Sequence, residues 1–281
     1  MMDDSVDIGA SIVIAATLAV ALSSHAISSA AAGRMLTTNR VEREQGLPIV
    51  GRAPMHAVYR ALVPIGRFLV WLGISANAVT VFSLVLAVAA SVAIALGHLG
   101  LGAAIACAAA LADAVDGIVA RESGTSSALG KVLDTTVDRY VDALLLGGLA
   151  VHVRHDVVPL VVVLSAIVGS FMVSYASSIE RELGVPDSGA AIPMRRAHRL
   201  AYVLIGATLA PFAGRLAGPD RPEARLVPIF VAVSAIAILG NVSAVRRLIV
   251  SARVAKLPPP VPAPPDSGPE VAPISRREAS R

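Results

Sequence analysis

Apolar residues in this chain occur in long runs separated by short polar or basic segments. The first run covers residues 8–32, and six further runs cover residues 77–97, 99–121, 128–151, 157–179, 199–214 and 225–245. Most approach the roughly 20 residues that an α-helix needs to cross a bilayer. Residues 53–72 read as an amphipathic helix, with Arg60 and Arg67 for lipid headgroups and Trp71 near the interface. The pattern predicts an all-α polytopic membrane protein: a six-helix transmembrane bundle with an additional N-terminal apolar helix and a juxtamembrane amphipathic helix.

These elements divide the chain into four segments. Residues 1–52 would hold the N-terminal apolar helix, which either spans the membrane or lies along its surface, and a basic linker. Residues 53–72 would form the juxtamembrane helix, and residues 73–256 the transmembrane domain. Residues 257–281 contain PPPVPAPP and are expected to be disordered, because such a tail cannot bury a core.

Composition strengthens the membrane prediction. Hydrophobic residues make up 55% of the 281 residues and charged residues only 16%, with a mean hydropathy of +0.71. Soluble domains carry about 25% charged residues, so a large soluble core is excluded. The runs are continuous rather than alternating, which favours helices over a β-barrel. Cys107 is the single cysteine, which excludes an internal disulfide and a CxxC site.

The basic residues indicate an orientation. The net charge of +4 and the pI near 9.7 could suggest nucleic acid, but the cations stand at the ends of apolar runs. That placement is typical of the positive-inside rule and of contact with anionic lipid, so no nucleic acid partner is expected. One side of the bundle collects most of the arginines, including Arg121, Arg181 and Arg196. We assign that side to the cytoplasm and the protein to the cell (inner) membrane.

Four aspartates lie inside this apolar background. They occur as Asp113-x-x-Asp116-Gly-x-x-Ala-Arg121 and, after eight residues, Gly-x-x-x-Asp134-x-x-x-Asp138. Each group falls on one face of a helix, and the turn between them makes an antiparallel hairpin in which the acidic faces can meet. An ionised carboxylate at bilayer depth costs roughly 2.5–3.5 kcal/mol, so four in one patch indicate a function.

Divalent metal is the ligand that this cluster predicts. Oxygen-rich ligation suits Mg²⁺ or Mn²⁺, and two such ions about 3.5–4 Å apart would neutralise the carboxylates and clamp phosphate oxygens. Arg121 offers a fork for phosphate at the same end. Two other interpretations stay open: a proton or cation transporter that uses the aspartates as a relay, and a structural network with Arg121, Lys131 and Arg139.

At these residues the chain resembles the CDP-alcohol phosphotransferase family, whose signature is D-x2-D-G-x2-A-R-x8-G-x3-D-x3-D. Every fixed position is matched, and the resemblance covers about residues 70–250. It implies that an alcohol hydroxyl attacks the β-phosphorus of a CDP-linked donor and that CMP is released. It also implies a homodimer. An inactive homologue that serves as a scaffold is a further alternative.

The resemblance also implies roles for single residues. The metals would be held by Asp113, Asp116, Asp134 and Asp138, and Asp138 would also be the catalytic general base. The CDP moiety would be contacted by residues of the signature and of a Pro-Asn-x-x-Thr element, in which Ala76 replaces the proline: Asn77, Thr80, Gly117, Arg121, Ser127 and Gly130. For Asn77, a helix N-cap is an equally good and compatible interpretation.

Membrane embedding favours CDP-diacylglycerol as the donor, with CDP-choline or CDP-ethanolamine as the alternative. Asp138-Arg139-x-x-Asp142, Ser174-Tyr175 and Arg196-x-x-Arg199 resemble the inositol-phosphate-using branch. The small polar acceptor is therefore expected to be inositol phosphate, held by Arg196, Arg199 and Lys131, with glycerol 3-phosphate and serine as alternatives. The sequence departs from that branch where Ile179 replaces an arginine and where Arg195 and His198 replace acidic residues.

Overall fold

The computed structural model describes residues 4–31, 53–185 and 194–256, and all regular structure in them is helical. The α-helices are α1 (Asp4–Ala31), α3 (Ala53–Trp71), α4 (Ala76–Ala95), α5 (Leu99–Glu122), α6 (Ala128–His152), α7 (Val157–Glu182), α8 (Arg196–Ala217) and α9 (Val227–Val254), and the 3₁₀-helix η1 (Pro222–Leu226) precedes α9. The all-α prediction is confirmed. The predicted basic linker and Pro-rich tail lie outside the described residues.

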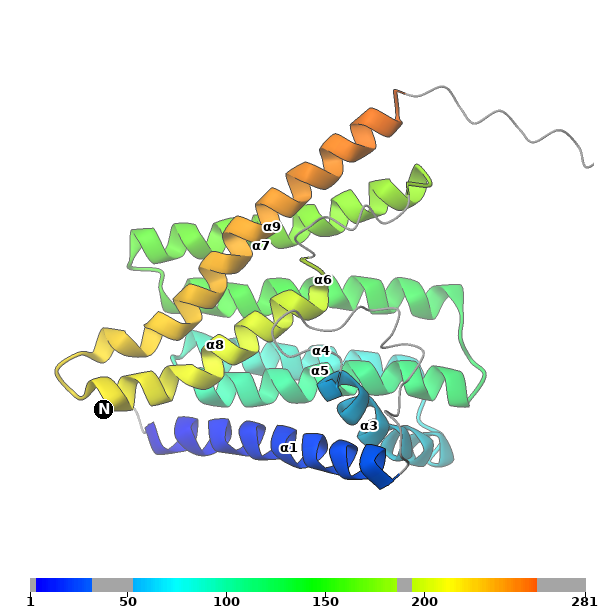
Figure 1. The fold of residues 1–281 in the computed structure, drawn as a ribbon, viewed down its shortest axis with the longest axis horizontal. Helices are drawn as coiled ribbons and strands as arrows, with labels where there is room; N and C mark the ends of the chain where they lie inside the picture. Colours follow the sequence, from blue (N-terminus) through cyan, green and yellow to red (C-terminus); the bar gives the residue numbers. More distant parts are fainter. Residues whose placement is uncertain (1–3, 32–52, 186–193, 257–281) are drawn as a thin grey trace, which may run out of the picture.

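Helix α5 runs antiparallel to both α4 and α6, because the connections before and after it are short (Figure 1). The turn from α5 to α6 needs a residue in the left-handed region, and Gly124 supplies it with φ of 66°. Ser127 then starts α6 by accepting a hydrogen bond from the Gly130 amide at 3.0 Å. The hairpin that the sequence predicts is therefore present, and both acidic segments lie at its turn.

Five helices among the described residues are long and apolar enough to cross a membrane: α4, α5, α7, α8 and the continuous η1–α9 segment. Helix α6 has the length of a span but falls short in apolarity because of five charged residues, Lys131, Asp134, Asp138, Arg139 and Asp142. In α1, the described apolar stretch Ser5–Thr17 is shorter than a span. Helix α8 begins at Arg196 rather than residue 199, and α9 continues to Val254 rather than ending at residue 245.

Small residues let these helices pack closely. A Cβ added at Gly148 of α6 would lie 2.4 Å from the Ser91 carbonyl oxygen of α4, and the Ser91 hydroxyl donates to the Leu144 carbonyl at 2.7 Å. At the crossing of α7 and α9, a Cβ at Gly169 would meet the Asn241 side chain at 2.8 Å. Backbones that approach this closely gain dispersion contacts and short polar links, which is how helices associate in lipid.

The N-terminal helix is tied to the end of the bundle that lies opposite the acidic segments. Asp7 of α1 is 1% exposed, and its Oδ1 accepts a hydrogen bond from the Leu101 amide in the first turn of α5 at 2.9 Å. Its Oδ2 lies 3.5 Å from Nη2 of Arg225. A carboxylate at a helix N-terminus accepts a hydrogen bond from a free backbone amide and interacts favourably with the positive end of the helix dipole. Helix α1 then runs toward the turn of the α5–α6 hairpin (Figure 1).

Candidate active site

The carboxylates of the two acidic segments meet where α5 and α6 face each other. One oxygen each from Asp113, Asp116 and Asp134 can be chosen so that all three lie within 4.8 Å of one another. Two come from α5 at i and i+3, and the third comes from the second turn of α6. The prediction that the acidic faces converge is therefore confirmed for these three residues.

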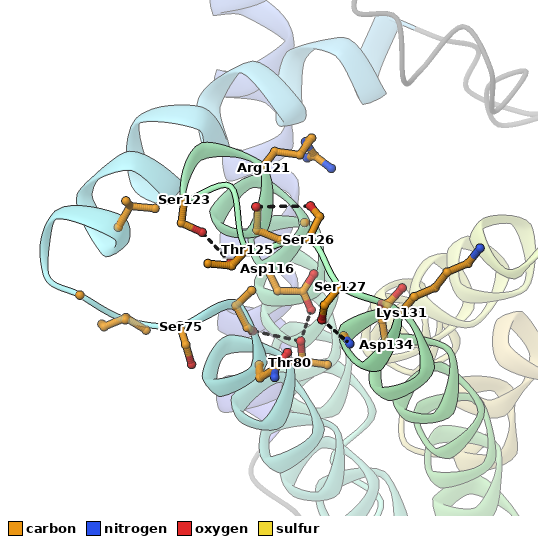
Figure 2. A pocket seen from close by; sticks show the side chains of 18 residues that line it. Ser75, Thr80, Asp116, Arg121, Ser123, Thr125, Ser126, Ser127, Lys131 and Asp134 are labelled. Atoms are coloured by element: carbon orange, nitrogen blue, oxygen red, sulfur yellow. Dashed lines mark hydrogen bonds between the residues drawn. The ribbon is translucent and has the colours of Figure 1, made fainter.

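Asp116 is the most enclosed member of the cluster. Its side chain is buried, and its Oδ2 accepts a hydrogen bond from the Thr80 hydroxyl at 2.6 Å. Figure 2 shows this bond across the α4–α5 interface. Thr80, which the resemblance places at the CDP site, is itself 4% exposed and also lines the cavity beside the cluster. The hydroxyl orients a carboxylate in the way that outer-shell groups orient metal ligands.

A cavity of about 570 Å³ opens beside this cluster between α4, α5 and α6 (Figure 2). It brings together all the residues predicted to contact CDP: Asn77, Thr80, Gly117, Arg121, Ser127 and Gly130. Gly130 keeps the wall open, because a Cβ there would lie 3.3 Å from the Ser127 hydroxyl and 3.5 Å from Asn77 Oδ1. We call this space the first cavity.

The structure corrects one of the two interpretations of Asn77. Ser75 is the N-cap of α4 and accepts a hydrogen bond from the Ala78 amide at 3.3 Å, whereas Asn77 lies within the first helical turn. The N-cap interpretation of Asn77 is therefore wrong. The reason is local: the extended backbone at Ser75, with ψ of 150°, places its hydroxyl over the free amides first. The Asn77 side chain faces the first cavity instead.

A second cavity, of about 530 Å³, lies on the α8 side of the cluster. Its wall includes Asp113 and Asp138 together with three basic side chains, Arg195, Arg196 and His198. Asp116, Gly117, Arg121 and Asp134 line both cavities. The acidic cluster is thus the partition between two spaces, one of which carries the residues predicted to contact CDP and the other a basic wall.

Arg196 connects the fourth aspartate to the cluster. Its Nη1 lies 2.9 Å from Asp113 Oδ2 and 2.5 Å from Asp138 Oδ1, so the guanidinium bridges α5 and α6. Asp138 does not belong to the group of three carboxylates, and its ion pair with Arg196 links it to that group. Arg196 also lines the second cavity.

The other two residues predicted to bind the acceptor do not line the second cavity. Lys131 is exposed and lines the first cavity, among the residues predicted to contact CDP. Arg199 is 3% exposed and points into the bundle, where its Nη2 donates to Asp142 Oδ2 at 2.6 Å. Only Arg196 of the three borders both Asp113 and Asp138.

Sequence reasoning missed a tyrosine that contacts the signature. Nη2 of Arg121 donates to the Tyr59 hydroxyl of α3 at 2.8 Å, and the guanidinium carbon lies 5.9 Å from the centroid of the Tyr59 ring. The two residues are 62 positions apart, and only the packing of α3 on α5 brings them together. The available signal was the amphipathic character of residues 53–72, which predicted a helix but not which polar side chain would face the site.

The donor set fits a hard divalent cation. Three carboxylates from two helices are close enough to share ligation after small side-chain movements, and oxygen is the atom that Mg²⁺ and Mn²⁺ prefer. No cysteine or histidine accompanies the three carboxylates among the described residues. Asp113, Asp116 and Asp134 are therefore the residues that would hold a metal, with Asp138 adjacent.

The sequence profile of CDP-alcohol phosphatidyltransferases matches residues 73–240, which include both cavities' principal residues. The chain belongs to the CDP-alcohol phosphatidyltransferase family. It is thus an enzyme of a family of membrane transferases that make phospholipids.

Two relatives illustrate the similarity. The phosphatidylinositol phosphate synthase of Mycobacterium tuberculosis (strain ATCC 25618 / H37Rv) is 34% identical over 172 residues, which cover 59% of this chain and 76% of that protein. The archaetidylinositol phosphate synthase of Pyrococcus horikoshii is 38% identical over 121 residues, which cover 42% of this chain and 62% of that protein.

The fold agrees with crystal structures of the mycobacterial synthase. Its complex with manganese and citrate superposes with a TM-score of 0.59 at 27% identity and covers 68% of this chain and 88% of that one. Its complex with CDP-diacylglycerol gives 0.58 at 27% identity and covers 68% and 94%. A protein of similar fold therefore binds manganese in one crystal and CDP-diacylglycerol in another.

Proposed function

We propose that this protein transfers the phosphatidyl group of CDP-diacylglycerol to a hydroxyl of inositol phosphate and releases CMP. The observation that carries the proposal is the position of the acidic cluster between two cavities, one lined by the CDP-signature residues and one by basic side chains. A phosphoryl transfer enzyme needs this arrangement, because donor and acceptor must meet at one phosphorus.

The first cavity suits the CDP part of the donor. Arg121 and Lys131 present positive charge there, and the hydroxyls of Ser123, Thr125 and Ser126 line the same wall. Phosphate oxygens are best met by a guanidinium fork and an ammonium group. The mycobacterial relative binds CDP-diacylglycerol, and the residues of this chain that match the family signature gather around the first cavity, which supports the same donor here.

The second cavity suits an acceptor that carries a phosphate. Arg195, Arg196 and His198 form its basic wall, and Arg196 reaches toward Asp138. Guanidinium groups recognise phosphate oxygens, which inositol phosphate carries and neutral inositol lacks. Both relatives named above are inositol phosphate-related synthases, which supports the same acceptor class.

Asp138 is the residue that we assign as general base. Its carboxylate borders the second cavity, within reach of an acceptor hydroxyl that enters beside Arg196. In the proposed step the acceptor oxygen bonds to the phosphatidyl phosphorus, the bond from that phosphorus to the CMP oxygen breaks, and the hydroxyl proton passes to Asp138. Arg196 would hold the acceptor phosphate and so fix the attacking oxygen.

The carboxylates of Asp113, Asp116 and Asp134 are proposed to hold divalent metal, two ions per site with Asp138. Bound Mg²⁺ or Mn²⁺ would neutralise the carboxylates and polarise the pyrophosphate oxygens. The protein's own contribution is to fix the ligands: Thr80 orients Asp116, and the α5–α6 hairpin sets the spacing.

The wider arrangement is also a proposal. With α6 as the sixth span, its charged side chains would meet the site or each other rather than lipid, because Lys131, Asp134 and Asp138 line the two cavities and Arg139 lies beside Asp142. The site end of the bundle carries Arg181, Arg195 and Arg246, which supports a cytoplasmic position in the cell membrane. The protein is expected to work as a homodimer, as the resemblance implies.

The test is CMP release by the purified protein from CDP-diacylglycerol, with inositol phosphate, inositol, glycerol 3-phosphate or serine as acceptor. We expect release with inositol phosphate and Mg²⁺ or Mn²⁺, and none in excess EDTA. Turnover that persists in EDTA would contradict the metal assignment. Preference for another acceptor would contradict the acceptor assignment, and ion flux without cytidine nucleotide would favour a transporter instead.

A further inference from the structure

The guanidinium of Arg121 is held by an aromatic residue that lies outside both cavities. Its Nη2 donates a hydrogen bond to the Tyr59 hydroxyl of α3 at 2.8 Å, and its central carbon lies 5.9 Å from the centroid of the Tyr59 ring. At that distance a cation is attracted to an aromatic face. Arg121 borders both cavities and Tyr59 borders neither, so Tyr59 can act on a ligand only through Arg121.

Tight packing of α3 on α5 fixes the position of Tyr59. Tyr59, Leu62 and Gly66 fall at i, i+3 and i+7, which places them on one face of α3. Leu62 is buried in a cluster that includes Ile118 of α5, and a Cβ added at Gly66 would lie 2.5 Å from Cγ2 of Ile118. Because close-packed helices have little room to slide, the phenol is presented to Arg121 in one register.

The acidic residue next to Arg121 in the chain pairs with a different arginine. Oε1 of Glu122 lies 3.3 Å from Nε of Arg67, on α3. Arg121 itself forms no ion pair with any carboxylate in the part of the chain that the structure describes, and its partner Tyr59 is neutral. A neutral acceptor orients a guanidinium without cancelling its charge, so the charge of Arg121 stays available to an anion.

The contact also leaves most of the guanidinium free to bind. An arginine presents several N–H donors in one plane, and Tyr59 accepts from one of them. The others can meet two phosphate oxygens as a fork. Arg121 is exposed, and an exposed arginine without an anchor would lose its rotamer freedom on binding a ligand. An anchor that spares the fork therefore favours binding.

We propose that Tyr59 is a positioning residue for Arg121, which it holds at the first cavity so that the diphosphate of a CDP-linked donor meets the guanidinium already in place. The proposal rests on the proposed function for the identity of the ligand. It adds α3 to the helices that build the donor site. The contrary arrangement, in which the phenol keeps Arg121 away from the donor, predicts a change of the opposite sign.

The first measurement is the dissociation constant of CDP, in the presence of Mn²⁺, for the purified full-length protein. Tyr59→Phe removes the hydroxyl and keeps the ring beside the guanidinium. We expect it to weaken CDP binding about fivefold, the effect of one neutral hydrogen bond. In an Arg121→Gln background the same substitution should add nothing, because it acts through Arg121.

The matched control is Tyr202→Phe, which alters a half-buried tyrosine of α8 that borders neither cavity and should leave CDP binding unchanged. Three results would overturn the proposal. Unchanged affinity in Tyr59→Phe would show that the hydroxyl has no positioning role, and tighter binding would show that it restrains Arg121 away from the donor. An equal loss in the Arg121→Gln background would show that Tyr59 contacts the ligand itself.

Steady-state kinetics separate positioning from a general loss of structure. Tyr59→Phe should raise KM for CDP-diacylglycerol about fivefold, while kcat and KM for inositol phosphate stay within about twofold. A fall in kcat with unchanged KM for the donor would contradict positioning at the first cavity. A protein whose CDP affinity follows the expected pattern but which releases no CMP would sustain the role of Tyr59 and contradict the proposed function instead.

Discussion

A single hydroxyl illustrates how neutral side chains shape the acidic site. Thr80 donates to Asp116 at 2.6 Å from the neighbouring helix α4, so the buried carboxylate has one fixed orientation. Without that donor, Asp116 could rotate within a low-dielectric space where an unpaired carboxylate oxygen is costly. The hydroxyl therefore acts on the metal site through Asp116.

Replacement of Thr80 tests this role. Thr80→Val keeps the shape but removes the hydrogen bond, and we expect the Mg²⁺ or Mn²⁺ concentration for half-maximal CMP release to rise about tenfold or more. Thr80→Ser retains the hydroxyl and should stay close to the wild type. Equal metal dependence of the Val and Ser variants would show that the bond has no such role.

Asp138 gives the second test at this scale. Asp138→Asn keeps the side-chain volume but removes the proposed proton acceptor, so CMP release should fall by at least about 10²-fold. Asp156→Asn is the control, because Asp156 is exposed at the start of α7, at the other end of the bundle, and makes no capping hydrogen bond. Unimpaired turnover by Asp138→Asn would exclude it as the base.

At the scale of helices, two adjacent glycines in α6 have opposite surroundings. A Cβ at Gly148 would meet the Ser91 carbonyl oxygen at 2.4 Å, whereas one at Gly147 would have nothing within 4 Å. The first glycine therefore sets the approach of α6 to α4, and the second only loosens the helix. Because α4 carries Thr80 and α6 carries Asp134, the distance between these two helices also sets the separation of the two site residues.

Gly148→Ala should thus destabilise the protein by about 1–3 kcal/mol through overpacking. Gly147→Ala should be neutral or slightly stabilising, because alanine is the better helix former. Thermal unfolding in one detergent compares the two variants directly. Similar unfolding temperatures for both would mean that the α4–α6 contact adapts at little cost.

The sequence predicted some parts of this arrangement better than others. The spacing of Asp113, Asp116 and Asp134 predicted that their carboxylates converge, because helical periodicity places each acidic segment on one helix face and a short turn brings the two helices together. The direction of Arg199 was not predictable, since the rotation of α8 about its axis depends on packing with α6. The Tyr59–Arg121 contact and the choice of Ser75 as N-cap likewise depend on tertiary or local geometry that spacing does not encode.

At the scale of the whole molecule, polar groups divide between two ends. The acidic cluster and its arginines occupy the end with the α5–α6 turn, and Asp7 ties α1 to α5 at the opposite end (Figure 1). Leu183, which follows α7, belongs to the first end, and Asp220, which follows α8, belongs to the second. Orientation in the membrane is thus testable with one residue from each end.

Single cysteines at these two positions, in a Cys107→Ala background, should react differently with a membrane-impermeant maleimide on intact cells. We expect labelling of Asp220→Cys, and labelling of Leu183→Cys only after permeabilisation, because basic residues crowd the Leu183 end. The reverse pattern would place the site outside the cytoplasm.

The wall that the two cavities share has a kinetic consequence. Asp116, Gly117, Arg121 and Asp134 border both spaces, so donor and acceptor can be present together and approach one phosphorus from different sides. Such a layout favours direct displacement within a ternary complex over a covalent phosphatidyl-enzyme that hands its group on. Double-reciprocal plots should intersect, and a donor made chiral at the transferred phosphorus should give product of inverted configuration.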